Sequence, residues 1–354
     1  SSPPLPLCRS AALPPGMASR THLQAWVKTS ARRRLGSGPE RKPWRMSAGA
    51  RRAYSLEPLN PRFGAIVNGI NLSEDLDMNV VEGLKRDVHT HRLLLFRQQG
   101  KLCAKKQLEV SEWFGKLEST FFKHPRSPDP DIFRVSNDPK EGCTNVGRSG
   151  WHIDGTFLAA PFKIQTMCFW SVSKNGSTLF APLNEVVKGL TEKEYSLWKR
   201  LYFIAIKSRA TGCTDFRNSV GMQPKNISQK WTVHPLIYPH PVSGDLTLCF
   251  HCGRSFAEGF VVNFNSEKDE AEAWLSEDET TEILRALKEK LESKDLCYKM
   301  NWKEGDFAIV DNLAIAHYAS PDTQNSPLTN GLRILHRTTV TSEHSPLGIR
   351  ELMQ

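Results

Sequence analysis

The residues best suited to chemistry in this chain are two histidines and a carboxylate that could share one metal ion. Among the 11 histidines, only His152 is followed two residues later by a carboxylate, that of Asp154. On an extended strand, residues i and i+2 point to the same side, so both side chains could reach one ion while Ile153 packs behind them. His317, far downstream, could supply a second imidazole. Two imidazoles and one carboxylate leave the opposite side of a metal open, which is the ligand set of non-heme Fe(II) oxygenases.

Two arginines near the end of the chain could bind an anion. Arg333 and Arg337 are four residues apart, so on a strand both side chains point to the same face. The planar guanidinium group matches a carboxylate, and a hydroxyl can donate a further hydrogen bond to the same group. Thr178 follows Asp154 by 24 positions. The alternative is that both arginines form ordinary surface ion pairs.

The elements that must position these residues are mostly short strands. Apolar runs and alternation predict strands at 63–72, 92–97, 151–154, 162–172, 177–180, 298–302, 306–310, 313–317 and 332–340. Helical spacing and capping residues predict helices at 79–89, 107–114, 191–201 and 276–291. We expect 162–172 and 177–180 to pair as a hairpin, and the polar stretch 208–233 to be an insertion that covers a site. This pattern indicates a β-sandwich or jelly roll.

The net charge of +9 is concentrated at the start of the chain. Residues 1–54 contain eleven Lys or Arg and one acid, whereas the remaining 300 residues contain 36 basic and 37 acidic side chains. That near-neutral remainder lacks the electrostatic footprint of a nucleic-acid-binding protein. No apolar run approaches the roughly 18 residues that cross a bilayer. We therefore expect a small-molecule substrate, with neither nucleic acid nor membrane as partner; the oligomeric state is not readable.

The basic leader has the composition of a mitochondrial transit peptide, since it is rich in Arg, Ser and Ala and poor in acids. We expect the true start at Met17, cleavage before Ser55, a location in the mitochondrial matrix and a catalytic domain over residues 55–354. The eight scattered cysteines fit a matrix enzyme with reduced thiols. The alternative for residues 1–54 is a disordered basic tail.

Several segments together resemble the Fe(II)- and 2-oxoglutarate-dependent taurine dioxygenase (TauD/TfdA-like) family. That family's pattern is H-x-D, a Thr or Ser about two dozen residues later, a distal His and then an Arg. The chain matches it at 64–72, 151–157, 234–236, 239–244 and 333–337, and the resemblance covers residues 59–342. It implies a mainly β fold with a double-stranded β-helix (jelly roll) core and flanking helices.

The resemblance also implies a role for each residue of the site. Fe(II) would be bound by His152, Asp154 and His317. 2-Oxoglutarate would be the cosubstrate together with O2, and its far carboxylate would meet Arg333 and Thr178. The reaction would hydroxylate a substrate with release of succinate and CO2.

Two further residues are assigned to the primary substrate by the resemblance. Arg337 would contact its acidic group and His124 would lie beside it, so the substrate would be a small organic sulfonate, carboxylate or phosphonate. An exposed loop histidine is the alternative for His124. Fifteen residues separate His317 from Arg333, more than is usual in the family, because of a loop-like insertion at 321–327.

Two other functions remain open at this point. A related hydroxylase of trimethylammonium substrates, as in the carnitine-pathway dioxygenases, would need aromatic residues that cage a quaternary ammonium group. Those enzymes carry an additional N-terminal metal-binding domain, whereas residues 1–54 contain one Cys and one His. A non-catalytic jelly-roll binding protein would have lost a metal ligand or the cosubstrate arginine. Neither loss is present in this chain.

Overall fold

The computed structural model describes residues 53–118, 123–206, 232–267 and 271–349. The leader prediction, including Met17, and nearly all of the predicted insertion at 208–233 lie outside these residues. Within the described part, no helix combines the length and apolar character needed to cross a membrane. All six cysteines recorded there are free thiols.

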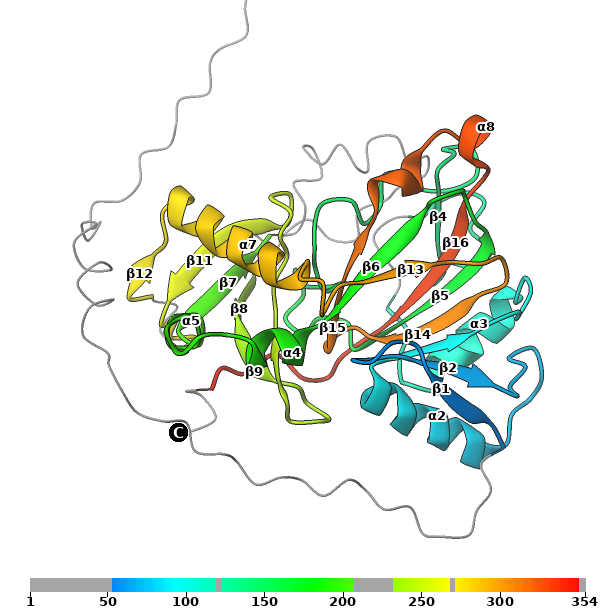
Figure 1. Ribbon diagram of the computed structural model, residues 1–354, viewed down its shortest axis with the longest axis horizontal. Helices are drawn as coiled ribbons and strands as arrows, with labels where there is room; N and C mark the ends of the chain where they lie inside the picture. Colours follow the sequence, from blue (N-terminus) through cyan, green and yellow to red (C-terminus); the bar gives the residue numbers. More distant parts are fainter. Residues whose placement is uncertain (1–52, 119–122, 207–231, 268–270, 350–354) are drawn as a thin grey trace, which may run out of the picture. The chain divides into compact units, whose positions relative to one another are not determined.

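A seven-stranded sheet forms one wall of the fold (Figure 1). Its strands lie in the order β1 (Ser55–Pro58), β2 (Ala65–Asn68), β3 (Leu93–Phe96), β14 (Phe307–Asp311), β5 (Ile164–Ser171), β16 (Ile334–Val340) and β4 (Phe133–Ser136). Only the β2–β3 pair is parallel. Side chains alternate between the two faces of each strand. Along β5, Met167 and Phe169 therefore enter one core, whereas Ile164 and Cys168 enter another.

A three-stranded sheet faces the first one across a shared apolar core. Its strands are β13 (Tyr298–Asn301), β6 (Ser177–Pro182) and β15 (Ile315–Ala319). Phe180 and Met300 of this sheet pack in one cluster with Phe169 and Leu335 of the larger sheet. Two sheets that enclose a common core form the jelly roll, so the predicted mainly β architecture is confirmed.

Helices cover the outer faces, as the helical patterns predict. Helix α2 (Met78–His91) and helix α3 (Ala104–Glu112) lie beside the large sheet (Figure 1), and Leu84 and Val88 of α2 pack with Phe96 and Phe307. Helix α7 (Glu277–Leu291) begins with the predicted capping box between Ser276 and Glu279. Burial of one apolar stripe holds each of these helices in place.

The rest of the described chain forms a second cluster around a four-stranded sheet. Its strands are β12 (Ala273–Trp274), β11 (Ala257–Val262), β7 (Leu201–Ala205) and β8 (Thr232–Pro235). The hairpin β9 (Ile237–Pro239)–β10 (Leu246–Leu248) and the helices α4 (Leu183–Lys188), α5 (Glu192–Trp198) and α7 complete it. The insertion at 321–327, predicted as a loop, contains the 3-10 helix η1 (Pro321–Gln324) and the start of helix α8 (Pro327–Asn330).

Two strand predictions are wrong. Strands β5 and β6 do not pair as a hairpin, because they belong to the two facing sheets and the chain crosses between them at Asn175, which has a φ of 62°. The segment 151–154 is not a strand either. His152 makes isolated bridges to His251 and His317, and Asp154 already lies in a turn. Alternation predicts which face a residue occupies but not which strand lies next to it.

Candidate metal centre

The three predicted metal ligands converge at one point. His152, Asp154 and His317 each offer one ligand atom, and these atoms lie within 4.8 Å of one another. Nε2 of His152 is 3.8 Å from Oδ1 of Asp154, and Nε2 of His317 is 3.3 Å from Oδ2. Two nitrogens and one oxygen at these separations could all bind a single ion, with other positions of that ion left for further ligands.

Backbone pairing places the two imidazoles side by side. The N–H groups of His152 and His317 each donate to the carbonyl of the other, at 3.1 and 3.0 Å. His317 lies in strand β15 of the three-stranded sheet. The bridge to His317 therefore attaches His152 to that sheet, although 151–154 is not a strand. After Asp154 the chain turns at Gly155, which has a φ of +88° and where a Cβ would lie 2.8 Å from the nitrogen of Phe162.

A hydrogen bond fixes which ring nitrogen of His152 is free. Nδ1 of His152 lies 2.7 Å from the carbonyl of Gly150, an acceptor, so this nitrogen carries the proton and Nε2 is left for a metal. Nδ1 of His317 is 3.5 Å from the side-chain nitrogen Nε2 of Gln165, at the outer limit of a hydrogen bond. Burial, with the neighbouring His317, lowers the pKa of His152 to about 4. The ring is therefore neutral near pH 7, as a ligand must be.

Arg337 reaches this centre and pairs with the ligand carboxylate. Its Nη1 donates to Oδ2 of Asp154 at 2.8 Å, and the guanidinium lies 5.2 Å from the ring of Phe133. Burial alone would raise the pKa of Asp154, but Arg337 and His317 outweigh it and hold that pKa well below its usual range. The carboxylate is thus ionised at all pH values at which the protein would bind a metal.

Arg333 is a buried guanidinium with no described anion beside it. The residue directly precedes β16, and its side chain is 4 % exposed and lies 5.7 Å from the ring of Phe169. Nη1 has no hydrogen-bond partner, and burial lowers the pKa of Arg333 to about 10. A buried charge is costly unless it is paired. The position therefore fits an anionic ligand.

The hydroxyl of Thr178 is oriented by a tryptophan in the same core. Nε1 of Trp302 donates to Oγ1 of Thr178 at 2.9 Å, and the Trp302 ring stacks on Phe169 at 4.1 Å. Phe169 is the ring next to Arg333, so Thr178 and Arg333 border one aromatic pair. With its oxygen accepting from Trp302, the hydroxyl can donate its own proton to a ligand.

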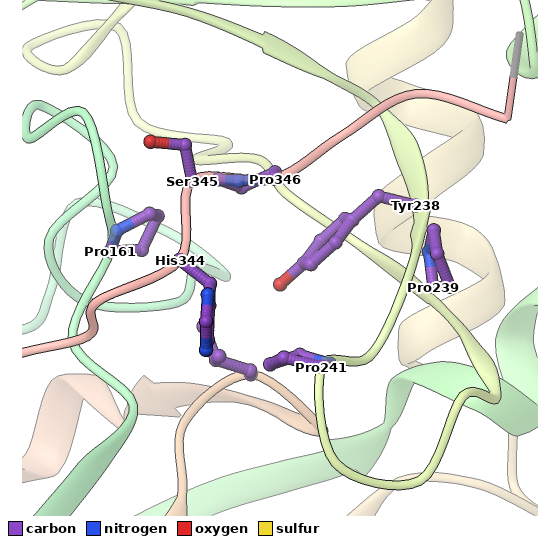
Figure 2. Close-up of a pocket in the computed structure, with 8 residues that line it drawn as sticks. Pro161, Tyr238, Pro239, Pro241, His344, Ser345 and Pro346 are labelled. Atoms are coloured by element: carbon purple, nitrogen blue, oxygen red, sulfur yellow. The ribbon is translucent and has the colours of Figure 1, made fainter. Parts of the chain in front are cut away.

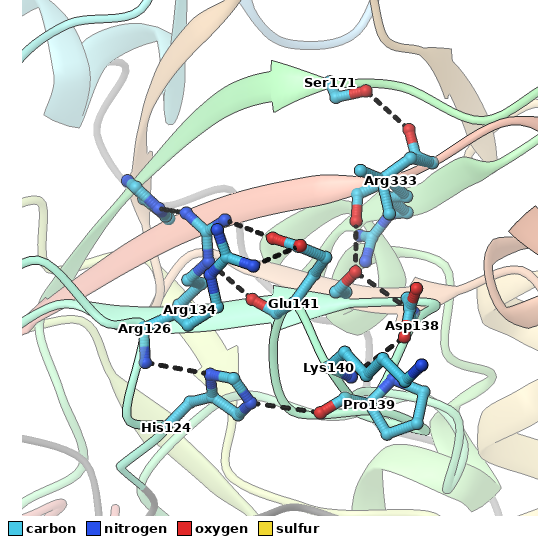
Figure 3. A network of polar contacts seen from close by, with 12 residues as sticks. His124, Arg126, Arg134, Asp138, Pro139, Lys140, Glu141, Ser171 and Arg333 are labelled. Carbon is cyan, nitrogen blue, oxygen red and sulfur yellow. Dashed lines mark hydrogen bonds and ion pairs between the residues drawn. The ribbon is translucent and has the colours of Figure 1, made fainter.

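His124 lies in the polar network of Figure 3, to which Arg333 belongs only through its backbone carbonyl. Nε2 of His124 lies 3.1 Å from the carbonyl of Pro139, and Nδ1 accepts from the backbone N–H of Arg126 at 3.2 Å. Arg126 and Arg134 both donate to the carboxylate of Glu141. Both ring nitrogens of His124 are thus used within its own loop, and its role toward substrate stays a prediction that these contacts do not support.

His251 also lies at the metal centre, although no sequence motif points to it. His251 stacks on His152 with ring centroids 4.6 Å apart, and Phe256 also stacks on His251, at 4.6 Å. Nδ1 of His251 accepts from the N–H of Gly253 at 2.8 Å. The row of rings forms an aromatic wall beside the metal ligands. In the sequence, His251 stands out only as part of Cys249-Phe250-His251-Cys252, and no spacing rule connects it with His152.

A separate hollow is lined by none of these residues (Figure 2). It is bordered by Tyr238, Leu313, His344, Ser345 and four prolines. The buried hydroxyl of Tyr238 points into it and has no hydrogen-bond partner. Its volume of about 20 Å³ holds no more than a water molecule. This hollow is therefore too small to hold an organic substrate.

Comparison with known proteins gives a family match over most of the chain. The family model described as "Taurine catabolism dioxygenase TauD, TfdA family" matches residues 55–339. The chain is 26% identical over 301 residues to an alkylsulfatase of Acinetobacter baylyi, covering 81% of this chain and 85% of that protein. It is also 26% identical over 288 residues to an alpha-ketoglutarate-dependent 2,4-dichlorophenoxyacetate dioxygenase of Cupriavidus pinatubonensis, covering 73% of this chain and 90% of that protein.

Solved structures share the fold. A taurine dioxygenase from Burkholderia xenovorans superposes with a TM-score of 0.63 at 22% identity, covering 84% of this chain and 92% of that one. The structure of AAD-2 in complex with Mn(II) and N-oxalylglycine also gives a TM-score of 0.63, at 20% identity and with 83% and 99% of the chains covered. These likenesses confirm the predicted jelly-roll core.

Proposed function

This chain belongs to the taurine catabolism dioxygenase TauD, TfdA family, and on that premise we propose that it is an Fe(II)- and 2-oxoglutarate-dependent dioxygenase that hydroxylates a small organic anion. The observation that carries the proposal is the pairing of two preformed features. One is the group of His152, Asp154 and His317, whose ligand atoms lie within 4.8 Å. The other is the unpaired, buried guanidinium of Arg333.

The residues present fit both bound groups. Neutral imidazoles and an ionised carboxylate are suitable ligands for Fe(II). A dicarboxylate that binds the metal at one end requires a cation for its other end, and Arg333 with Thr178 offers a planar fork and a hydroxyl donor. Bound together, Fe(II) and 2-oxoglutarate supply the oxidation of a substrate C–H group by O2, with succinate and CO2 as co-products.

The remaining residues orient the substrate and exclude water. Arg337 presents a second guanidinium beside the metal ligands, where an anionic group of the substrate can accept from it. The stacked rings of His251 and Phe256 form an apolar wall next to His152. We therefore propose a substrate with an anionic head and an apolar body. Relatives named for a sulfate ester and for phenoxypropionate are consistent with this class.

The two other functions are less well supported. A trimethylammonium substrate would be repelled by a guanidinium at the position of Arg337. A binding protein without catalysis would not need the complete ligand group together with a buried, unpaired arginine. Both remain outcomes of the experiment below.

The test is succinate release from 2-oxoglutarate over a panel of alkyl and aryl sulfates, sulfonates, carboxylates and phosphonates. Each anion is paired with its neutral alcohol and with a trimethylammonium analogue of the same body. We expect at least one anion to stimulate succinate release in the wild type but not in His152→Ala. Stimulation only by the cationic analogues would overturn the substrate class. Turnover that survives His152→Ala would overturn the metal site.

We also propose that residues 1–54 direct the protein to the mitochondrial matrix. Their basic, acid-poor composition supports this, and β1 begins at Ser55, directly after the expected cleavage point. Expression of the chain in eukaryotic cells with a C-terminal tag tests it. We expect a mitochondrial product whose N-terminus is Ser55. An uncleaved product outside mitochondria would contradict the proposal.

A further inference from the structure

The backbone of the metal ligand Asp154 is not held by a sheet. Asp154 lies in a turn, after the single bridge residue His152 and before Gly155. A ligand outside a ladder lacks the paired N–H and C=O bonds that fix strand residues. Other groups must hold it, because a catalytic ligand is useful only when its position is kept to within a fraction of an ångström.

The side chain of Asn312 supplies those missing bonds. Oδ1 of Asn312 accepts from the N–H of Asp154 at 2.8 Å, and Nδ2 donates to the carbonyl of Asp154 at 2.9 Å. Nδ2 also donates to the carbonyl of Phe162 at 2.6 Å, which closes the turn at Gly155. The amide of Asn312 thus pairs with Asp154 as the peptide group of a neighbouring strand would. Asn312 is fully buried, so water does not compete for these bonds.

The residue before it, Asp311, is anchored by two histidines from different elements. Its Oδ2 accepts from Nδ1 of His89, on α2, at 2.7 Å, and its Oδ1 accepts from Nε2 of His240, between β9 and β10, at 3.1 Å. Oδ1 also accepts from the N–H of Leu313 at 3.2 Å. Burial alone would raise the pKa of Asp311, but His240 and His89 outweigh it and hold it at about 2.

This second group of two histidines and one aspartate is not a second metal site. Nδ1 of His240 accepts from the backbone N–H groups of Val242 and Ser243, both at 3.2 Å. Nε2 must therefore carry the ring proton, which it donates to Asp311. A metal at this position would need Nε2 unprotonated while Nδ1 faces two N–H donors. The tautomer fits a hydrogen-bonded clamp and excludes a metal ligand.

We propose that the Asp311–Asn312 turn holds the metal centre in position. Asn312 positions the ligand Asp154. Asp311, which is itself held by His89 and His240, positions Asn312. The proposal rests on the proposed metal site and goes beyond it, because it predicts that residues without contact to the metal contribute to the affinity for the metal. Helix α2 and the β9–β10 hairpin then support the centre through a single buried carboxylate. Partners of this kind typically change metal affinity by about 10- to 100-fold when they are removed.

The test uses Mn(II) alone, added to the metal-free full chain, with bound ion measured from the loss of the free-ion EPR signal. We expect Asn312→Ala to weaken Mn(II) binding by about 10- to 100-fold. Ser111→Ala is the matched control, since it removes a buried hydrogen bond of 2.7 Å to the carbonyl of Gln107 in α3 and leaves the Asp311–Asn312 turn and Asp154 untouched. We expect it to lose thermal stability to a similar degree but to keep its Mn(II) affinity.

Variants of His89 decide the matter even if Asn312→Ala fails to fold, because the side chain of His89 is partly exposed. His89→Leu removes the donor to Asp311 and should weaken Mn(II) binding by at least about 3-fold. His89→Asn returns an N–H donor and should restore it. If Asn312→Ala and His89→Leu keep wild-type Mn(II) affinity while His152→Ala loses it, the proposed role of the Asp311–Asn312 turn is overturned and the metal site is not. Unchanged binding in His152→Ala would overturn the metal site itself.

Discussion

The guanidinium of Arg337 and the carboxylate of Asp154 are hydrogen-bonded at 2.8 Å. The residue proposed to hold the substrate anion is therefore paired with a proposed metal ligand. A substrate anion beside the metal would offer Arg337 a second acceptor. The pair thus connects substrate binding with the charge at the metal centre.

Replacing Arg337 by Gln should weaken the primary substrate and spare the cosubstrate. A hydrogen bond to a charged group contributes about 1.5–3 kcal/mol, so we expect KM of the anionic substrate to rise about 10- to 100-fold. Affinity for Fe(II) should stay equal or increase, because a competing positive charge leaves Asp154. Steady-state kinetics and anaerobic Fe(II) titration measure both.

Arg254→Gln, at an exposed arginine that pairs with Glu277, is the control. An equal loss of 2-oxoglutarate affinity in Arg337→Gln would show that the two arginine roles are wrongly assigned.

Replacing Arg333 by Met should have opposite effects on ligand binding and on stability. Truncating one partner of a buried charge pair costs about 2–5 kcal/mol, so 2-oxoglutarate affinity should fall by at least about 30-fold. The ligand-free protein should be as stable as the wild type or more so, because the substitution removes an unpaired buried charge. Thermal unfolding of the metal-free protein measures the second effect.

Arg97→Met is the matched control for Arg333. Arg97 pairs with the fully buried carboxylate of Asp306, so its loss leaves an unpaired charge and should destabilise the ligand-free protein. Equal destabilisation by Arg333→Met would mean that Arg333 already has an anionic partner within the chain.

The hydroxyl of Thr178 should contribute a smaller part of cosubstrate binding. Thr178→Val keeps the side-chain shape but loses both the donor to the ligand and the acceptor for Trp302. We expect a loss of about 1 kcal/mol, or about 5-fold in 2-oxoglutarate affinity by anaerobic titration. Thr178→Ser keeps the hydroxyl and should bind nearly as the wild type does. If Ser and Val behave alike, the hydroxyl is not part of the site.

Stability of the metal-free protein should fall as the pH drops below 6.5. Burial lowers the pKa of His234 to about 4 and, with Arg134 nearby, that of His336 to about 3, whereas both would titrate at 6.5 when unfolded. Between these values the unfolded chain binds more protons than the folded one. Each of these two histidines therefore lowers the stability by up to about 1.4 kcal/mol per pH unit as the pH falls below 6.5. Above pH 6.5 neither makes the stability depend on pH.

Urea denaturation at several pH values measures this slope, and His234→Gln isolates one contribution. Nε2 of His234 lies 2.8 Å from the carbonyl of Thr156, and the amide of Gln can still donate there without titrating. The variant should lose stability less steeply than the wild type between pH 6.5 and 4. An identical slope would mean that His234 is not the group that titrates.

The parts of the fold that follow local rules are predictable from the sequence. Capping residues at Thr191 and Ser276 mark the helices that the structure has at α5 and α7. The positions of His152, Asp154 and His317 are readable because metal ligands of this family occur in a fixed pattern. Local patterns cannot show which strands become neighbours, since alternation fixes only the face. The pairing of 162–172 with 177–180 was wrong for this reason.

The supports of the metal centre could not be read from the sequence. Asn312 follows a strand in what looks like an ordinary turn. The three backbone groups that its side chain bonds belong to Asp154 and Phe162, which are 158 and 150 residues away. His251 approaches His152 through an isolated bridge between distant segments. Such contacts arise from the tertiary fold, which brings side chains together without leaving a spacing in the chain.

The most direct test of the proposed metal and cosubstrate sites is an anaerobic titration of the metal-free protein with Fe(II) in the presence of 2-oxoglutarate. The signal is the visible absorption that Fe(II) gains when a 2-oxo acid chelates it. We expect saturation at one Fe(II) per chain in the wild type and no saturable signal in His152→Ala or His317→Ala. A wild-type protein without that absorption, or an unchanged titration in either variant, would contradict it.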